Sequence, residues 1–176
     1  MRATARKRRS FMTMQRWLFA VVASLILIFT GVFVYFRDIQ QPQWLEAKEA
    51  KQQATQFADL ASVEKVYRHI WNKESWIVQG SNQQDEEIYV WLSEDQSPVS
   101  SLAAEGVTKE QISDEFKKKK QDADIIRIQP GLFDDVRVWE VYYRDGDSSI
   151  HYYYDFYKFD NGAFIDSYKL PAKTEP

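Results

Sequence analysis

Residues 17–36, WLFAVVASLILIFTGVFVYF, form an uncharged apolar run near the start of the 176-residue chain. A helix rises about 1.5 Å per residue, so a run of this length matches the roughly 30 Å hydrocarbon core of a bilayer. The run is longer than the apolar part of a cleaved signal peptide, which has about 7–15 residues, and no small-x-small cleavage motif follows it. The run therefore predicts a transmembrane anchor that stays attached, with a cleaved signal peptide as the alternative.

The residues before this run are strongly basic. Residues 1–16 contain six Lys or Arg and no acidic residue, and such an excess marks the cytoplasmic side of a membrane. We therefore expect a cytoplasmic tail at 1–16, an anchor at 17–36 and an extracellular remainder, which makes the chain a single-pass protein of the cell membrane. The net charge is −3 and the first sixteen residues contribute +6, so the remainder carries −9. This acidic part disfavours binding of nucleic acid or anionic wall polymers by bulk charge.

The sequence contains no recognisable catalytic or metal-binding pattern. The absence of cysteine excludes disulfides, thiol catalysis and cysteine-type zinc sites, and His69 and His151 lack the spacing of a zinc motif. Residues 144–149, RDGDSS, resemble part of a calcium loop but lack its remaining ligands, so we interpret them as a hairpin turn. No GxSxG, SxxK or glycine-rich phosphate motif occurs. We expect a non-enzymatic protein without cofactor, metal or small-molecule substrate.

The first part of the external region is predicted to contain a helix followed by three strands. From Trp44, Ala and Phe recur at helical spacing, with Lys, Glu and Gln between them. Strand-like segments follow at 63–71, 75–80 and 86–94. Residues 94–106 contain a proline and several small polar residues, so we interpret them as a connection between two units.

The same order then begins again. Thr108 is a good N-cap and Gln111 completes a capping box, so a helix is predicted to begin there. The lysine run at 117–120 is interpreted as the solvated end of this helix rather than as a phosphate or lipid site. Residues 160–162, Asp-Asn-Gly, are a strong hairpin signal. Three strand-like segments precede this signal, at 124–131, 136–144 and 149–159, and a fourth follows it at 163–170.

The repeated order predicts a tandem duplication. An offset of 63 residues aligns Trp76 with Trp139, Val78 with Val141 and Tyr89 with Tyr152. We therefore expect an α+β protein with two repeats, at 40–98 and 99–171, each with one helix packed on an antiparallel sheet.

Residues 138–170 are unusually rich in tyrosine, and we expect Val138, Trp139, Val141 and Ile150 to be buried. One helix covers only one face of a sheet, so the other face must meet water, the other repeat or a partner. Core packing and partner binding both remain open, and stacking on wall glycans is a third possibility. The candidates for partner contact, chosen by strand parity, are Tyr89, Trp91, Tyr153 and Tyr157.

The order of these motifs resembles the TseB/YpmB-like family over residues 15–170. The motifs are the anchor, the Ala/Lys/Glu helix, EIYVWLSE, EGVTKEQISDEF and VWEVYYRDGDSSIHYYYDF. The resemblance implies a membrane-anchored extracytoplasmic protein of Gram-positive bacteria with two PepSY-like (cystatin-like) repeats. It also implies regulation of cell-wall elongation and cell shape by binding a class B penicillin-binding protein or another wall-synthesis protein, without catalysis.

Two other functions remain open beside this one. PepSY-like domains elsewhere suggest an inhibitor or modulator of a secreted peptidase, and the aromatic strands are compatible with a glycan-binding module for peptidoglycan. The chain departs from the family in its longer basic N-terminus and in the greater tyrosine content of its last hairpin, so the contact details do not carry over.

Overall fold

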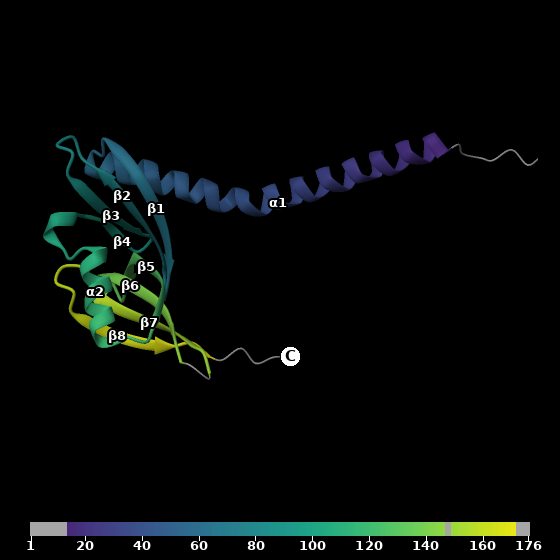
Figure 1. The fold of residues 1–176 in the computed structure, drawn as a ribbon. Coiled ribbons are helices and arrows are strands. Elements are labelled where there is room, and N and C mark those ends of the chain that lie inside the picture. Colours follow the sequence, from purple (N-terminus) through teal and green to yellow (C-terminus); the bar gives the residue numbers. More distant parts are fainter. Residues whose placement is uncertain (1–13, 147–148, 172–176) are drawn as a thin grey trace, which may run out of the picture. The chain divides into compact units, whose positions relative to one another are not determined.

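A computed structural model describes residues 14–146 and 149–171, and within residues 36–43 it describes the backbone only. The chain forms two compact units, one up to Leu45 and one from Glu46 onward. The predicted basic tail lies, apart from residues 14–16, outside the described residues. Figure 1 shows the order of helices and strands along the chain.

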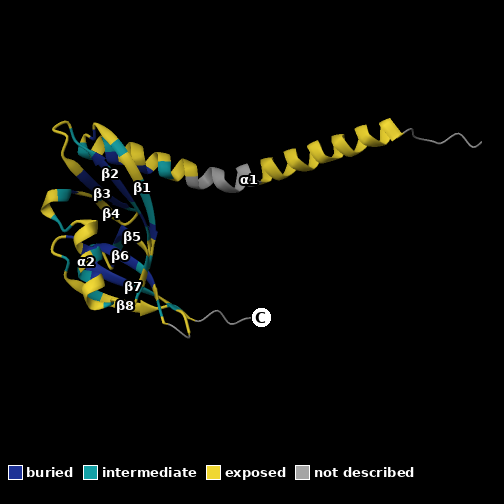
Figure 2. Ribbon diagram, in the orientation of Figure 1, coloured by how far each residue is buried: buried dark blue, intermediate teal, exposed yellow. Residues whose placement is uncertain are grey.

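The first helix, α1 (Met14–Ala58), contains the predicted anchor and also the predicted helix that begins at Trp44. The residues between these two segments are helical as well, so α1 is one continuous helix rather than two. Its part Met14–Tyr35 has a mean hydropathy of 2.6 and contains no buried residue (Figure 2). This part meets the length and composition requirement for crossing a membrane, a requirement that a signal sequence also meets.

The first antiparallel sheet contains four strands in the order β1-β2-β3-β4: β1 (Ser62–Ile70), β2 (Glu74–Ser81), β3 (Glu87–Ser93) and β4 (Gln96–Leu102). The end of α1 covers one face, where Ala50 and Ala54 pack against Val78, Val90 and Leu92. The two small alanines allow the helix to approach the sheet closely. The predicted helix and strands of this half are therefore present.

The strand β4 was interpreted as a connection, and that interpretation is wrong. Its residues pair with β3 from Ser93↔Gln96 to Ile88↔Leu102, so the boundary expected after residue 98 falls inside this strand. Because β4 is an edge strand, Pro98 is tolerated there and most of its side chains meet water. An exposed edge strand lacks the alternation of apolar residues by which strands are recognised in a sequence.

The second half contains the short helix η1 (Ala103–Glu105), the helix α2 (Lys109–Lys119) and a second four-stranded sheet in the order β5-β6-β7-β8. The strands are β5 (Asp124–Phe133), β6 (Val136–Asp145), β7 (His151–Lys158) and β8 (Phe164–Lys169). The capping box is confirmed, because Thr108 Oγ1 accepts from the Gln111 N–H at 3.2 Å and Gln111 Oε1 accepts from the Thr108 N–H at 2.8 Å. Gly162 has a φ of 70°, as the predicted hairpin turn requires.

The two sheets share more than their strand order. The ladder between the first two strands of each sheet is interrupted at the same place, by a bulge at Glu64 in β1 and at Ile126 in β5. This agreement is consistent with two tandem repeats. The offset of 63 residues holds for β2 and β6, but the ladders place Leu92 opposite Trp76 and Tyr157 opposite Trp139. The β6–β7 hairpin is therefore longer than its counterpart.

The largest core lies between the two sheets. The face of the first sheet that α1 does not cover contributes Ile77, Tyr89 and Trp91 to this core, while α2 and the second sheet contribute Ile112, Phe116 and Trp139, among others. The helix-free face of the first sheet thus meets the second repeat.

The burial predictions for the tyrosine-rich region are mostly confirmed. Val138, Trp139 and Val141 are buried, as predicted. The prediction for Ile150 is wrong, because this residue precedes β7 and is 53% exposed.

Candidate interaction surface

Three of the four predicted contact residues lie inside the core. The side chains of Tyr89, Trp91 and Tyr157 are buried, with at most 6% of each residue exposed, and Tyr153 is half-buried on β7. The Tyr153 ring stacks on Tyr143 at 5.2 Å between centroids. Burial of this depth favours the core-packing alternative for the first three residues, because a side chain without exposed area has little to offer a partner.

The buried aromatic residues join the two sheets to each other. Trp91 Nε1 donates a hydrogen bond to the carbonyl oxygen of Gly131 at 3.1 Å, and its ring meets Phe159 edge-on at 4.8 Å. Tyr89 makes similar edge-on contacts with Trp139 and Phe159. Edge-to-face aromatic pairs stabilise a contact by about 0.5–1.5 kcal/mol beyond the burial of their area. These buried contacts of Trp91 and Tyr89 therefore hold the two sheets in a defined relative position.

A buried polar contact also crosses between the sheets. Nε2 of His69 on β1 lies 3.1 Å from Oε2 of Glu140 on β6, and Nη2 of Arg127 lies 2.8 Å from the other carboxylate oxygen of Glu140. The His69 and Glu140 side chains are almost fully buried, whereas Arg127 is half-exposed. The backbone N–H of Leu132 donates to His69 Nδ1 at 3.4 Å. This set compensates a buried carboxylate at the junction of the repeats.

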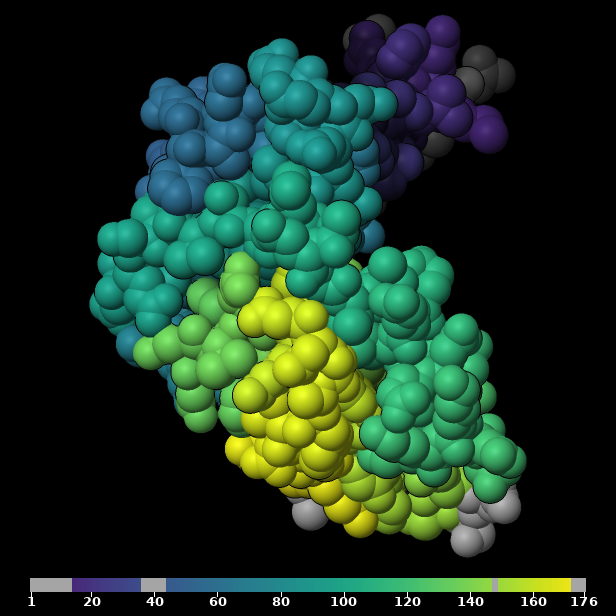
Figure 3. Space-filling view, turned by 90° about the vertical axis from the view of Figure 1, so that its left-hand side faces the viewer, coloured from purple at the N-terminus to yellow at the C-terminus, as the bar shows by residue number. Residues whose placement is uncertain are grey.

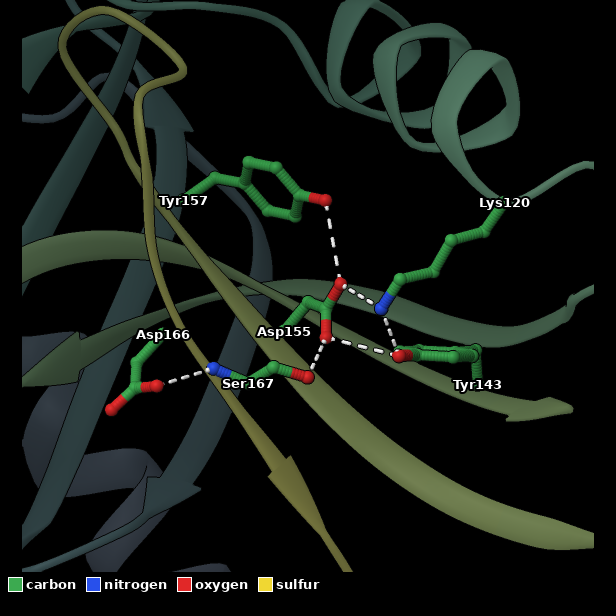
Figure 4. A network of polar contacts seen from close by, with 6 residues as sticks. All are labelled: Lys120, Tyr143, Asp155, Tyr157, Asp166 and Ser167. Carbon is green, nitrogen blue, oxygen red and sulfur yellow. Dashed lines mark hydrogen bonds and ion pairs between the residues drawn. The ribbon is translucent and has the colours of Figure 1, made fainter.

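A second buried carboxylate, Asp155 on β7, lies beneath the end of α2 (Figure 4). Its side chain is 1% exposed, and Lys120 Nζ lies 2.7 Å from Oδ2. Tyr143 and Ser167 hydroxyls donate to Oδ1 at 3.1 and 2.6 Å, and the Tyr157 hydroxyl approaches Oδ2 at 3.5 Å. The carboxylate is saturated by donors and by one ammonium group, so this network has the character of a structural ion pair rather than of a free general base.

Lys120 corrects the interpretation of the lysine run as a wholly solvated helix end. Residues 117–119 are exposed, whereas Lys120 is half-buried and also donates to the Tyr143 hydroxyl. Burial lowers the pKa of the Lys120 amine, but the hydrogen bonds to Asp155 and Tyr143 outweigh burial, so the pKa is raised above its ordinary value. No local pattern indicates that one lysine of the four points inward, because its position depends on β7 lying beneath the end of the helix.

The face of the second sheet opposite α2 presents a half-exposed group of aromatic side chains, which we call the tyrosine face: Trp71, Tyr142, Tyr152, Tyr154 and Tyr168. Tyr142 stacks with Tyr152 at 5.9 Å and with Tyr154 at 4.8 Å between centroids. Trp71 comes from the β1–β2 turn and meets Tyr154 and Tyr168 edge-on. The tyrosine face thus lies where the repeats join, and it was missed because strand parity alone could not say which face α2 covers.

The stacking geometry bears on what the tyrosine face can bind. Tyr142 is covered by the rings of Tyr152 and Tyr154, with interplanar angles of 23° and 24°. Arg127 places its guanidinium 5.7 Å from the Tyr142 centroid. Sugar stacking needs a free aromatic face, so rings that cover one another favour contact through their edges and hydroxyls.

An open groove of about 530 Å³, which we call the junction groove, lies between the first sheet and the start of α2. Tyr67, Tyr89 and Trp139 contribute aromatic lining, and Glu87 and Glu110 are exposed at its edges. The start of α2 is also close to the β7–β8 hairpin, because the Val107 N–H donates to the Phe159 carbonyl at 2.9 Å. Figure 3 shows this hairpin (yellow) beside α2 on the molecular surface.

Because the chain has no cysteine, its possible metal ligands are His, Asp and Glu. Among the described side chains, those of residues 14–35, 44–146 and 149–171, no three are grouped so that they could hold a metal ion. Within the described part of the chain, Ser149 Oγ lies 3.4 Å from the ring nitrogen Nε2 of His151.

The comparisons with known proteins agree with the resemblance expected from the sequence. Residues 49–93 match the model of the cell wall elongation regulator TseB-like domain. The fold matches the solved structure of the YpmB protein from Bacillus subtilis with a TM-score of 0.62 and 21% identity, over 70% of this chain and 96% of that chain. No curated protein matches the chain. The resemblance to the TseB/YpmB-like family is confirmed by the domain and the fold together.

Proposed function

For a chain that carries a TseB-like domain on the fold of YpmB, we propose a non-enzymatic regulator of cell-wall elongation that binds a class B penicillin-binding protein outside the membrane. The observation that carries this proposal is the match of residues 49–93 to the regulator domain, which supports a regulatory role and hence a wall-synthesis partner. The matched segment runs from the end of α1 through β3.

The proposal includes anchoring by the apolar part of α1, with the basic residues in the cytoplasm. Its support is the exposed apolar helix Met14–Tyr35 and the excess of Lys and Arg in residues 1–16. Intact-mass measurement of the protein extracted from membranes tests this part. We expect the mass of a chain that retains residues 14–35, and a mature chain that begins after residue 37 would contradict the anchor.

The distribution of buried charge supports binding rather than catalysis. Glu140 and Asp155, the carboxylates that are buried in the described part of the chain, are compensated by cationic or hydroxyl groups of the protein itself. A catalytic carboxylate needs access to a substrate within hydrogen-bonding distance. The stacked rings of the tyrosine face favour a protein partner over a glycan, and no feature of the described residues favours a peptidase partner over a wall-synthesis enzyme.

Copurification from native membranes tests the proposed function. The full chain with a C-terminal affinity tag is solubilised in mild detergent, and penicillin-binding proteins in the eluate are detected with a fluorescent penicillin. We expect a class B enzyme to be enriched over a control purification of an unrelated tagged single-pass protein. Equal labelling in both purifications would contradict the proposal, and enrichment of a secreted peptidase would favour the alternative.

A further inference from the structure

The junction groove combines the half-exposed ring of Tyr67 with carboxylates that form no ion pair within the described part of the chain. The lining comes from both repeats, with Tyr67 and Tyr89 from the first sheet and Trp139 from the second. The indole N–H of Trp139 donates to the Val107 carbonyl oxygen at 2.8 Å, which fixes the ring at the base of α2. A volume of about 530 Å³ lies within the range of roughly 300–1,000 Å³ that is typical of small-molecule sites, so the groove has room for a long side chain.

The charges around this groove are unbalanced. Glu64, Glu87 and Glu110 line it, and no Lys or Arg side chain in the described part of the chain forms an ion pair with any of them. Lys65 and Lys109 also line the groove, but they leave one negative charge in excess. The rest of the chain after residue 16 is acidic as well, so the field attracts cations from a distance.

Two of the groove's side chains are already arranged around Glu87. The Tyr67 hydroxyl donates to Gln79 Oε1 at 2.8 Å, and Gln79 Nε2 donates to Glu87 Oε1 at 2.7 Å. Burial raises the pKa of Tyr67, and the negative charges of Glu87 and Glu64 raise it further. The carboxylate of Glu87 is therefore held in place, which lowers the entropic cost of pairing it with an incoming cation.

An ammonium group over an aromatic ring already occurs in this groove. Lys65 Nζ lies 4.7 Å from the centroid of the Tyr67 ring. A cation in this position gains from the electron-rich ring face as well as from the nearby carboxylates. The groove is thus suited to a ligand that carries a lysine or arginine side chain.

We propose that the junction groove binds a lysine or arginine side chain on an extended segment of a protein partner, with Glu87 as its main counterion. The excess of negative charge and the half-exposed ring of Tyr67 determine this choice of occupant. The inference deepens the proposed function and rests on it for the nature of the partner. Because the groove is walled by both repeats, it would exist only while their junction is intact.

Binding of defined peptides to the full chain in detergent tests the inference. The probes are a fluorescent acetyl-Gly-Ala-Lys-Ala-Gly-amide peptide and its matched peptide with norleucine in place of lysine. We expect the lysine peptide to bind the wild-type chain more weakly as salt rises, and the norleucine peptide to show no saturable binding. Equal binding of the two peptides would overturn the inference.

Conservative variants locate the binding to the groove. Glu87→Gln keeps the shape of the side chain and is expected to weaken binding of the lysine peptide about tenfold. Glu110→Gln, on the first turn of α2, should weaken binding in the same direction. Asp122→Asn removes one exposed charge outside the groove and is the matched control. If Glu87→Gln behaves like Asp122→Asn while both remain folded by thermal unfolding, the inference is wrong.

The same chains separate this inference from the proposed function. If the wild-type chain enriches a class B penicillin-binding protein but the two peptides bind alike, the groove assignment fails and the proposed function stands. If the lysine peptide binds as expected but no wall-synthesis enzyme is enriched, the groove assignment stands and the proposed function fails.

Discussion

His69 of the first repeat lies 3.1 Å from Glu140 of the second, through Nε2 and Oε2, with both side chains almost fully buried. Because His69 Nδ1 accepts a hydrogen bond from the Leu132 N–H, the other ring nitrogen, Nε2, is the one that faces the carboxylate. Gly131 lies against the same ring, and a Cβ at this glycine would come within 2.5 Å of it. The junction therefore depends on one buried polar pair and a backbone that fits closely around it.

A double-mutant cycle tests this pair. His69→Leu removes the partner of a buried carboxylate and should lower the free energy of unfolding by about 1–3 kcal/mol. The double variant His69→Leu/Glu140→Leu should lose less than the sum of the single variants, because it removes both polar partners. Urea unfolding measures these differences, and additivity within about 0.5 kcal/mol would show that the residues do not interact.

The ion pair beneath α2 gives a second prediction, with a control on the same helix. Lys120→Met leaves Asp155 buried without its cation and should lower the free energy of unfolding by about 3–5 kcal/mol. Lys119→Met removes the exposed pair with Glu115 and a contact of Nζ at 6.0 Å from the centroid of the Tyr157 ring, and it should cost less than about 1 kcal/mol. Equal shifts of the urea midpoint for the two variants would contradict the described network.

The core between the sheets predicts a large effect for one tryptophan. Trp139 is 2% exposed and its indole N–H is hydrogen-bonded, so Trp139→Ala should lower the free energy of unfolding by about 3–5 kcal/mol. Ile150→Ala, at an exposed position, should change it by no more than about 0.5 kcal/mol. A thermal shift of less than about one degree for Trp139→Ala would place this residue outside the core.

Alkaline pH should destabilise the fold. Burial is the first cause that raises the pKa of Tyr67, Tyr89 and Tyr157 above the ordinary tyrosine value of about 10. A raised folded-state pKa gives stability that is complete below the unfolded-state pKa and is lost as pH rises through the folded-state value. We expect the urea midpoint to fall from about pH 9 to about pH 11. Tyrosine absorbance should show the buried hydroxyls ionising together with unfolding, and their ionisation in the folded chain near pH 10 would contradict their burial.

Much of the fold follows from local sequence patterns. The capping box of Thr108 and Gln111 and the turn at Gly162 depend on neighbours a few residues away, so they could be predicted. The edge strand β4 could not be predicted, because its residues are mostly exposed, include Pro98 and show no alternation of apolar and polar side chains. Strand parity separated the two faces of β7, but which face α2 covers depends on contacts between residues far apart in the chain.

The candidate surfaces were less predictable than the fold. The residues chosen from parity, Tyr89 and Trp91 among them, turned out to join the sheets, since the free face of the first sheet is used for packing. The buried pair of His69 and Glu140 has no local signature, because the two residues lie on different repeats. The tyrosine face could not be predicted either, because it combines a residue of the β1–β2 turn with residues of the second sheet.

Photocrosslinking in living cells tests the central claim most directly. A photoreactive amino acid replaces Lys65 in the junction groove or Tyr152 on the tyrosine face of the full-length chain, and replaces Asp122 as a control at a position that lines neither surface. Adducts are identified by mass spectrometry. A regulator of wall elongation predicts an adduct with a class B penicillin-binding protein from at least one of the first two positions and none from Asp122. Adducts with no wall-synthesis protein at either surface, from chains that are folded and located in the membrane, would contradict the account.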